Sequence, residues 1–341
     1  MTKTDLIIKK TLEYLKYPSV VGYEQPFINK LEKDFKSLQL STQRHSGLLS
    51  VKGNLPNSNI VSVHIDRHGL ISNGKGELEY AAYRVKSQNT NSEIEPNKKM
   101  WEKIASRFEN EKVYAYEPTT GKNIGSGRVE KCYICPVRNN FVFQVEELVH
   151  LKSGIPVSFS SHCGNSKKSI EGQLDNVINA ALGFALFKFG FQGTLLLTEG
   201  EEIGESWSHI YNYFLDQKIE TSRLIVLDTS PFEDDKSINM NSVILRSRDN
   251  NSEFEPVLTQ TIREKCASLN IPFLVKDEYL TNSKKTTNIG NTELGHLISN
   301  SKNKISGTTV QIATMGYHSN KERANYEAIH NVFRILSETL I

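Results

Sequence analysis

Apolar residues near the beginning of the chain recur at the spacing of an amphipathic helix. Ile8, Leu12 and Leu15 share one helical face, and a second apolar set with the same period runs from Phe27 to Leu38. A connector that contains proline and glycine, residues 18–24, separates the two sets. The pattern predicts two helices joined by a turn.

Four later segments are short runs of branched apolar residues, which are typical of strands buried on both faces. They cover residues 59–63, 193–198, 223–228 and 308–314. Helical patterns lie between or after them, at residues 177–189, 258–269 and 332–340. This alternation predicts an α/β fold with a mixed, mostly parallel sheet and helices on both faces.

The alternation stops between residues 71 and 164. This stretch contains a polar tract at 86–99, one amphipathic segment around Trp101, and several short β-like runs. We expect an inserted, mostly β domain at 71–164, with a main domain formed by 1–70 and 165–341. Exposed strand edges need pairing or covering, so the insertion is also the expected site of self-association and is placed to affect substrate access.

Side chains that can bind metals follow each of the predicted strands. His64 and Asp66 follow the first strand, Glu201 and Glu202 the second, Asp228 closes the third, and His318 follows the fourth. The functional crevice of an open α/β sheet lies outside the carboxyl ends of its strands, so these segments should converge. Taken alone, each has an ordinary structural explanation; Asp175, for example, could simply cap the helix that follows it.

Imidazole and carboxylate groups without thiolates are typical of a catalytic zinc site rather than a structural one. His64 and Asp66 lie two residues apart and would face the same side of an extended segment. Asp66 could then accept a hydrogen bond from the second ring nitrogen of His64 and fix its tautomer. Alternatively, Asp66 could form a turn before Gly69.

These residues lie in motifs that resemble the tetrahedral aminopeptidases, a family of co-catalytic di-zinc metallopeptidases also called deblocking or glutamyl aminopeptidases. The motifs are Tyr17 to Glu24, His64-Ile-Asp66, Leu174-Asp175-Asn176, Thr198 to Gly204, Val226-Leu-Asp228 and Met315 to Ser319. The resemblance covers most of 1–70 and 165–341 and is weak in the insertion. It implies a zinc exopeptidase-like fold and dimers that assemble further, up to a dodecamer.

The resemblance also implies a role for each site residue. The implied metal ligands are His64, Asp175, Glu202, Asp228 and His318, with Asp175 bridging the two ions. Glu201 would be the general base and Asp66 a second catalytic residue. Two Zn²⁺ ions would be balanced by Asp175, Glu202, Asp228 and one bridging hydroxide, which gives a neutral cluster in a partly desolvated site. Co²⁺ or Mn²⁺ would fit similar ligands.

The implied function is removal of N-terminal residues from short peptides by a zinc-bound hydroxide. Related zinc exopeptidases and deacylases typically carry their extra domain before the last histidine, whereas the insertion here lies between His64 and Asp175. Two alternatives stay open: a di-zinc deacylase or dipeptide-like hydrolase, and a metal-binding paralogue without catalysis. Glu201 argues against the second alternative, because a binding module needs no base.

The sequence departs from the family pattern at three places. Val177 follows Asn176 where an arginine is usual, Ser206 and Trp207 replace small residues, and the segment 291–295 differs from the usual substrate segment. These departures leave the metal set unchanged and concern the substrate pocket and the assembly.

Composition limits the classes of binding partner and the cellular locations that we expect. Lys and Arg number 41 against 39 for Asp and Glu, without a long run of one sign, so we expect no nucleic-acid partner. The longest apolar run, 180–187, is far shorter than the ~20 residues of a membrane span. Four cysteines are too few for a disulfide scaffold, which favours the cytoplasm. Cys132 and Cys135 are expected to be reduced thiols; a structural zinc shared with His162 and Cys163 is the alternative.

Overall fold

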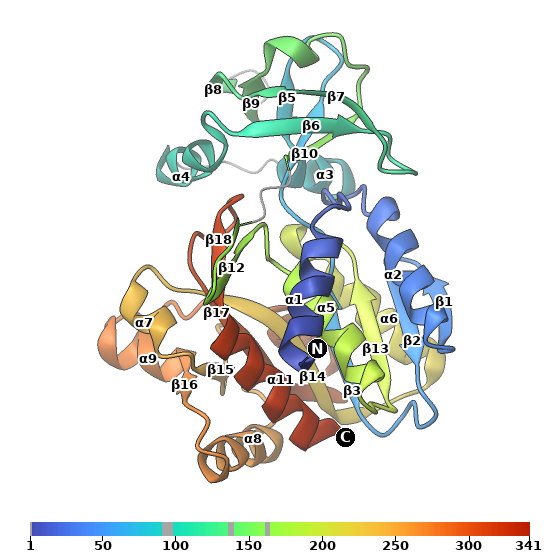
Figure 1. Ribbon diagram of the computed structural model, residues 1–341, viewed down its shortest axis with the longest axis vertical. Coiled ribbons are helices and arrows are strands. Elements are labelled where there is room, and N and C mark those ends of the chain that lie inside the picture. Colours follow the sequence, from blue (N-terminus) through green and yellow to red (C-terminus); the bar gives the residue numbers. More distant parts are fainter. Residues whose placement is uncertain (1, 91–97, 136–139, 161–163) are drawn as a thin grey trace.

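Two large β-sheets lie at opposite ends of the molecule in Figure 1. The computed structural model of the chain describes residues 2–90, 98–135, 140–160 and 164–341. Within these residues, no helix combines the length and apolar character that a bilayer span requires.

The larger sheet has eight strands in the order β1-β2-β13-β3-β14-β17-β15-β16. They are β1 (Ser41–His45), β2 (Leu48–Lys52), β3 (Ile60–His64), β13 (Thr194–Thr198), β14 (Thr221–Pro231), β15 (Val243–Arg246), β16 (Phe273–Val275) and β17 (Ile305–Thr314). The central strands β13, β3, β14 and β17 are parallel, whereas β2 and β15 run antiparallel to the central strands that they border. The mixed, mostly parallel sheet is therefore confirmed.

The central strands are apolar on both faces because two separate cores cover them. Val61 and Val63 belong to one core, while Ile60, on the opposite face of the same strand, belongs to the other. Successive side chains of a strand point to opposite faces, so a strand covered on both sides reads as a continuous apolar run.

Helices cover each face of this sheet. One face is covered by α1 (Lys3–Tyr14), α2 (Gln25–Ser37), α5 (Val177–Lys188), α8 (Pro256–Ser268) and α11 (Tyr326–Leu340), of which α1 and α11 are prominent in Figure 1. The other face is covered by α6 (Ser206–Gln217) and α10 (Glu293–Ser301). Two further helices, α7 (Asp235–Asn239) and α9 (Lys276–Ser283), pack beside β15 and β17. The two N-terminal helices and the helices on both faces are confirmed.

The smaller sheet has seven strands, all antiparallel, in the order β7-β6-β10-β4-β5-β9-β8. They are β4 (Leu70–Ser72), β5 (Leu78–Tyr80), β6 (Lys112–Tyr116), β7 (Asn123–Arg128), β8 (Lys131–Cys135), β9 (Asn140–Gln144) and β10 (Pro156–Phe159). The helices α3 (Ala81–Thr90) and α4 (Lys98–Phe108) and the 3₁₀ turn η1 (Glu146–Leu148) accompany it. The inserted, mostly β region is confirmed.

A core rich in aromatic side chains packs against the smaller sheet. Phe108 of α4 stacks on Phe159 with ring centroids 4.5 Å apart, and its centroid lies 5.1 Å from that of Phe143. Trp101 is also buried in this core. The same core includes Val20 and Val21, from the connector between α1 and α2, so it joins the inserted sheet to the rest of the molecule.

A third sheet of three short strands lies near the junction. It consists of β11 (Gly164–Asn165), β12 (Ser169–Gly172) and β18 (Glu322–Asn325), all antiparallel. The sequence pattern did not predict it, nor did it predict β1, β2, β15 and β16. Strands β1, β11 and β16 lie at the edges of their sheets, where most side chains are exposed or half-buried and the apolar signal is weak. Strands β2 and β15 are buried inside the larger sheet, and the sequence prediction missed their short apolar runs.

Candidate metal centre

The predicted site residues converge at the carboxyl edge of the central parallel strands. His64 is the last residue of β3, and Asp228 lies beside it on β14, because Val63 and Leu227 are paired in the register. Glu201 and Glu202 begin the 3₁₀ turn η2 (Glu201–Ile203) that follows β13. The sequence pattern suggested that Asp228 closes the third strand. The strand β14 instead continues to Pro231, so Asp228 lies within it.

A first group of possible metal ligands forms around His64. Its Nε2 is 3.3 Å from Asp175 Oδ1 and 3.4 Å from Asp228 Oδ1. Asp175 lies in the loop between β12 and α5, far from β3 in the sequence but adjacent in space. These three side chains can supply one ligand atom each within 4.8 Å of one another.

A second group forms around His318, in the loop between β17 and β18. Its Nε2 is 3.6 Å from Glu202 Oε2 and 3.6 Å from Asp175 Oδ2. The two carboxylate oxygens of Asp175 therefore face the histidines of two different groups. The second group also contains His68, whose Nε2 is 2.6 Å from Glu202 Oε2.

The donor set fits divalent cations on two independent grounds. Burial raises the pKa of Asp175, Glu201 and Glu202, and neighbouring carboxylates raise it further. Such a cluster of buried carboxylates is costly unless protons or cations neutralise it. In addition, Asp175 Oδ1, which faces His64 Nε2, is buried with no hydrogen-bond partner in the described part of the chain, although buried polar atoms are usually paired.

Asp66 lies beside His64 but uses its oxygens differently from the sequence expectation. Its Oδ1 is 3.6 Å from His64 Nδ1, which is longer than a hydrogen bond. Instead, its two oxygens accept hydrogen bonds from the backbone N–H groups of Glu201 (3.0 Å) and Glu202 (2.9 Å). Asp66 therefore fixes the start of the turn that carries both glutamates.

A buried carboxylate outside the expected set holds two ligand-bearing loops together. Glu322, at the start of β18, accepts hydrogen bonds from the backbone N–H groups of Asp175 (2.8 Å) and His318 (2.6 Å). His318 has a φ of 59°, in the left-handed region that a residue with a side chain rarely adopts. The bond to Glu322 is one of the contacts that maintain this backbone conformation.

A pocket of about 540 Å³ opens next to the first group. Its lining includes Glu201, Asp228, Arg246, Lys276 and Tyr317. Burial is the main cause that lowers the pKa of Lys276, to about 7. Glu201 thus faces an open space beside the candidate metal ligands, whereas its neighbour Glu202 faces His68 and His318.

Comparison with known proteins rests on structure, because no family model and no curated protein matches the sequence. An aminopeptidase from the archaeon Desulfurococcus kamchatkensis superposes with a TM-score of 0.74 at 13% identity, over 99% of this chain and 95% of that one. The TET1 peptidase of Pyrococcus horikoshii gives a TM-score of 0.72 at 13% identity, over 98% and 99% of the two chains. A TET aminopeptidase from a marine-sediment thaumarchaeon gives 0.70 at 14% identity, over 98% and 94%.

The chain has the tetrahedral-aminopeptidase fold. The likeness extends over nearly the whole length of each chain, so it includes the inserted sheet, where the sequence resemblance was weak.

Within this tetrahedral-aminopeptidase fold, the inserted region brings two residues to the second group. The Tyr80 hydroxyl is 2.6 Å from His68 Nδ1, and an Arg107 N–H faces His318 Nδ1 at 3.4 Å. Burial lowers the pKa of His68 to about 3, and the positive charge of Arg107 adds to this effect.

Sequence reasoning missed four of these residues: His68, Tyr80, Arg107 and Glu322. A usable signal existed only for His68, which continues the two-residue spacing of His64 and Asp66 along an extended segment. Tyr80, Arg107 and Glu322 reach the site through tertiary contacts that no local pattern reveals.

The residues at the three departures from the family pattern are held by contacts within the fold. Val177 is fully buried in the core that covers one face of the larger sheet, and the Trp207 indole donates to the Gly204 carbonyl at 3.1 Å. Glu293 is buried beneath the site, where it accepts hydrogen bonds from the hydroxyls of Ser62 and Thr198. It points into the sheet rather than into the pocket.

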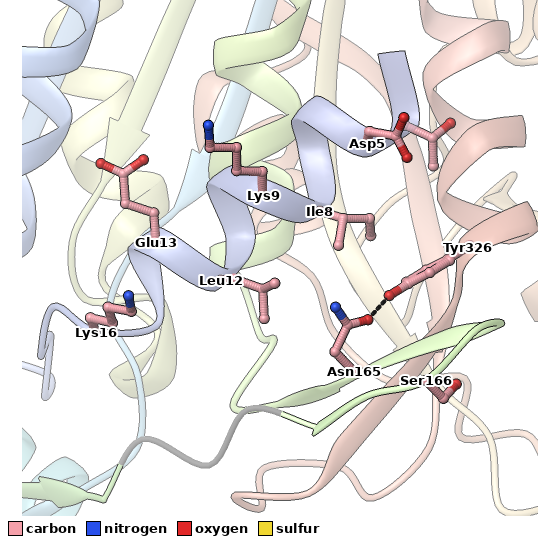
Figure 2. A pocket seen from close by; sticks show the side chains of 10 residues that line it. Asp5, Ile8, Lys9, Leu12, Glu13, Lys16, Asn165, Ser166 and Tyr326 are labelled. Atoms are coloured by element: carbon pink, nitrogen blue, oxygen red, sulfur yellow. Dashed lines mark hydrogen bonds between the residues drawn. The ribbon is translucent and has the colours of Figure 1, made fainter. Parts of the chain in front are cut away.

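The remaining candidate features lie outside this site. Cys132 and Cys135 lie on β8, and their suggested partners, His162 and Cys163, lie outside the described residues. A separate pocket of about 650 Å³, shown in Figure 2, is lined by α1 and by residues around Asn165 and Tyr326. Among the described residues that line it, none belongs to either group of possible metal ligands.

Proposed function

We propose that the protein is a metallo-aminopeptidase that binds two divalent ions and releases N-terminal residues from short peptides. One observation supports the proposal: Asp175 directs one oxygen to His64 and the other to His318, so a single carboxylate could serve two ions. His64 and Asp228 would complete the first position, and Glu202 and His318 the second. Zinc is the expected ion, and cobalt or manganese would fit the same ligands.

When bound, two such ions supply Lewis-acid chemistry, which lowers the pKa of water and polarises a scissile carbonyl. The chain's own residues would do the rest. A carboxylate oxygen of Glu201 would accept the proton of the attacking water and later deliver it to the leaving amine. Asp66 would act as a positioning residue in this scheme, because it holds the backbone of Glu201.

The pocket beside Glu201 would receive the side chain of the substrate's N-terminal residue. Its lining carries both signs of charge: Arg246, Lys276 and Lys284 are basic, and Glu233 and Asp234 are acidic. This mixture of charges does not select one class of N-terminal side chain on charge alone.

We further propose that the chain self-associates through the inserted sheet, in the cytoplasm. The two edge strands of this sheet, β7 and β8, carry the exposed apolar side chains Ile124 and Ile134. Apolar edge strands are usually paired or covered. The Pyrococcus horikoshii TET1 peptidase, which has the same fold, assembles into a tetrahedron or a large octahedral shell, and a dodecamer is the assembly we expect.

The decisive experiment is a metal-reconstituted activity screen on two matched substrate sets. Metal-free protein is loaded with zinc, cobalt or manganese and assayed on aminoacyl amides and short peptides, and on the same compounds with an acetylated α-amine. The proposal predicts hydrolysis of the free-amine set and little of the acetylated set. The reverse preference would make the protein a deacylase, and two bound ions without hydrolysis of either set would make it a metal-binding protein.

A further inference from the structure

His68 is the least expected member of the candidate metal centre. It lies in the loop after β3 with 6% of its surface exposed. Its Nε2 is 2.6 Å from Glu202 Oε2 and 2.6 Å from His318 Nδ1. Its other ring nitrogen, Nδ1, is 2.6 Å from the Tyr80 hydroxyl. One side of the ring therefore faces the second group, and the other side faces the inserted sheet.

The position of the hydrogen on the imidazole ring determines whether His68 can bind a cation. A neutral imidazole has one N–H and one lone pair, so two arrangements fit the distances. In one, Nδ1–H donates to the Tyr80 oxygen and the Nε2 lone pair faces the Glu202 carboxylate. In the other, the Tyr80 hydroxyl donates to Nδ1, and Nε2–H donates to Glu202.

The first arrangement creates a cation site when His318 Nδ1 also presents a lone pair, and the second does not. The Nε2 lone pair of His68 then meets Glu202 Oε2 and His318 Nδ1, each 2.6 Å away, and such acceptors repel one another unless a cation lies close to them. A histidine that binds a metal typically donates its second ring N–H to a fixed partner, and the Tyr80 hydroxyl is in that place. His68 would also add a ligand without adding charge to a cluster that already contains the carboxylates of Asp175 and Glu202.

We propose that His68 is a further ligand of the second metal position through Nε2, and that Tyr80 of the inserted sheet holds its ring in the required tautomer. The inference rests on the two-metal function proposed above. The second position then has four side-chain ligands, His68, Glu202, His318 and the shared Asp175, whereas the first has three. A set of four is typical of tightly held zinc, and a set of three leaves a place for water or substrate. The second ion should therefore bind more tightly and exchange more slowly.

Counting imidazoles on bound zinc distinguishes the two arrangements. X-ray absorption of the zinc-loaded full chain reports the number of imidazoles per ion. We expect three imidazoles over two ions in the wild type, from His64, His68 and His318, and two over two ions in His68→Gln. Competition with a chelator should show that His68→Gln weakens the tighter of the two zinc sites by more than about 100-fold, which exceeds the effect of losing an outer hydrogen-bond partner.

Two matched variants complete the design. Tyr80→Phe removes only the hydroxyl and should weaken the same site by about 10-fold without changing the imidazole count. His330→Gln replaces an exposed histidine on α11 and should change neither quantity. If His68→Gln does not fold, as judged by circular dichroism, the wild-type count and Tyr80→Phe still decide the question.

The imidazole count can also overturn the inference. Two imidazoles over two ions in the wild type would show that His68 donates a hydrogen bond to Glu202 and binds no metal, which overturns the inference. A wild type that binds no zinc would overturn both this inference and the two-metal function. Three imidazoles over two ions in a protein that hydrolyses no amide would support the assignment and refute only the proposed function.

Discussion

The two large sheets contribute to the candidate site in different ways. The eight-stranded sheet has parallel central strands covered on both faces, and its strand ends deliver His64 and Asp228 directly. The seven-stranded sheet is antiparallel, with edge strands that are largely exposed. It supplies Tyr80 and Arg107 from the end of a strand and from a helix. Parallel strands bring functional side chains together at the carboxyl edge of their sheet, whereas the inserted sheet contributes residues by packing next to that edge.

The largest expected effect tests the chemistry assigned to the eight-stranded sheet. Glu201→Gln keeps the size of the side chain but cannot accept a proton, so kcat should fall by about 10²–10⁴ while both ions stay bound. Glu202→Gln should instead reduce metal content, and excess zinc or cobalt should partly restore activity. The measurement is kcat together with metal content for both variants. Loss of metal in Glu201→Gln, with both ions retained in Glu202→Gln, would exchange the two roles.

The second prediction concerns assembly through the inserted sheet. Ile124 and Ile134 are each 42% exposed on β7 and β8. Replacing both by lysine places charge on the proposed interface, so light scattering should show a much smaller particle than the wild type. Val257→Lys, at an exposed apolar position on α8, is the matched control and should keep the full assembly. A wild type that is monomeric at micromolar concentration would remove the assembly proposal.

The third prediction asks whether the two sheets lose stability separately. Phe108 and Phe214 are both buried, one in the core of the inserted sheet and the other beneath the eight-stranded sheet. Replacing either by alanine should cost about 3–5 kcal/mol of unfolding free energy. Hydrogen exchange should then accelerate mainly in the sheet that lost its phenylalanine. Equal acceleration in both sheets after Phe108→Ala would mean that they unfold as one unit.

The smallest expected effect is a pH dependence in the pocket beside the eight-stranded sheet. Burial lowers the pKa of Lys276 to about 7 in the folded chain, below its usual value of 10.5. The folded state therefore binds fewer protons than the unfolded state between about pH 7 and 10.5, and wild-type stability should rise with pH across this window. Lys276→Met abolishes this contribution.

The measurement is the difference in melting temperature between Lys276→Met and the wild type. It should favour the variant most at pH 6, where the full cost of the buried charge applies, and less at pH 9. A difference that does not change with pH would show that Lys276 titrates normally.

The central strands and the candidate metal ligands could be predicted from the sequence, because burial on both faces leaves a recognisable apolar run. Strands buried on both faces, such as β3 and β13, leave a continuous apolar signal, and the ligands follow their carboxyl ends. The five residues that the motif resemblance implied lie together in space: His64, Asp175 and Asp228 form one group, and Glu202 and His318 lie on the other side of Asp175.

The residues that escaped prediction depend on contacts between distant segments. Glu322 has no local pattern that marks it, and its role arises only because β18 pairs with β12 and turns its carboxylate toward two backbone N–H groups. The expected hydrogen bond from His64 to Asp66 was a reasonable local inference, but η2 competes for both oxygens of Asp66. Local spacing shows which side chains can come close to one another, but it does not show which of several possible hydrogen bonds forms.

The position of Glu322 has a consequence for biosynthesis. His64 leaves the ribosome long before His318 and Glu322, which lie much later in the chain. The β12–β18 pairing that orients Asp175 joins segments separated by most of the second half of the chain, and such long-range contacts form late in folding. A nascent chain that lacks His318 and Glu322 can therefore offer isolated ligands but not the assembled pair of groups, so we expect metal loading to follow the synthesis of these residues.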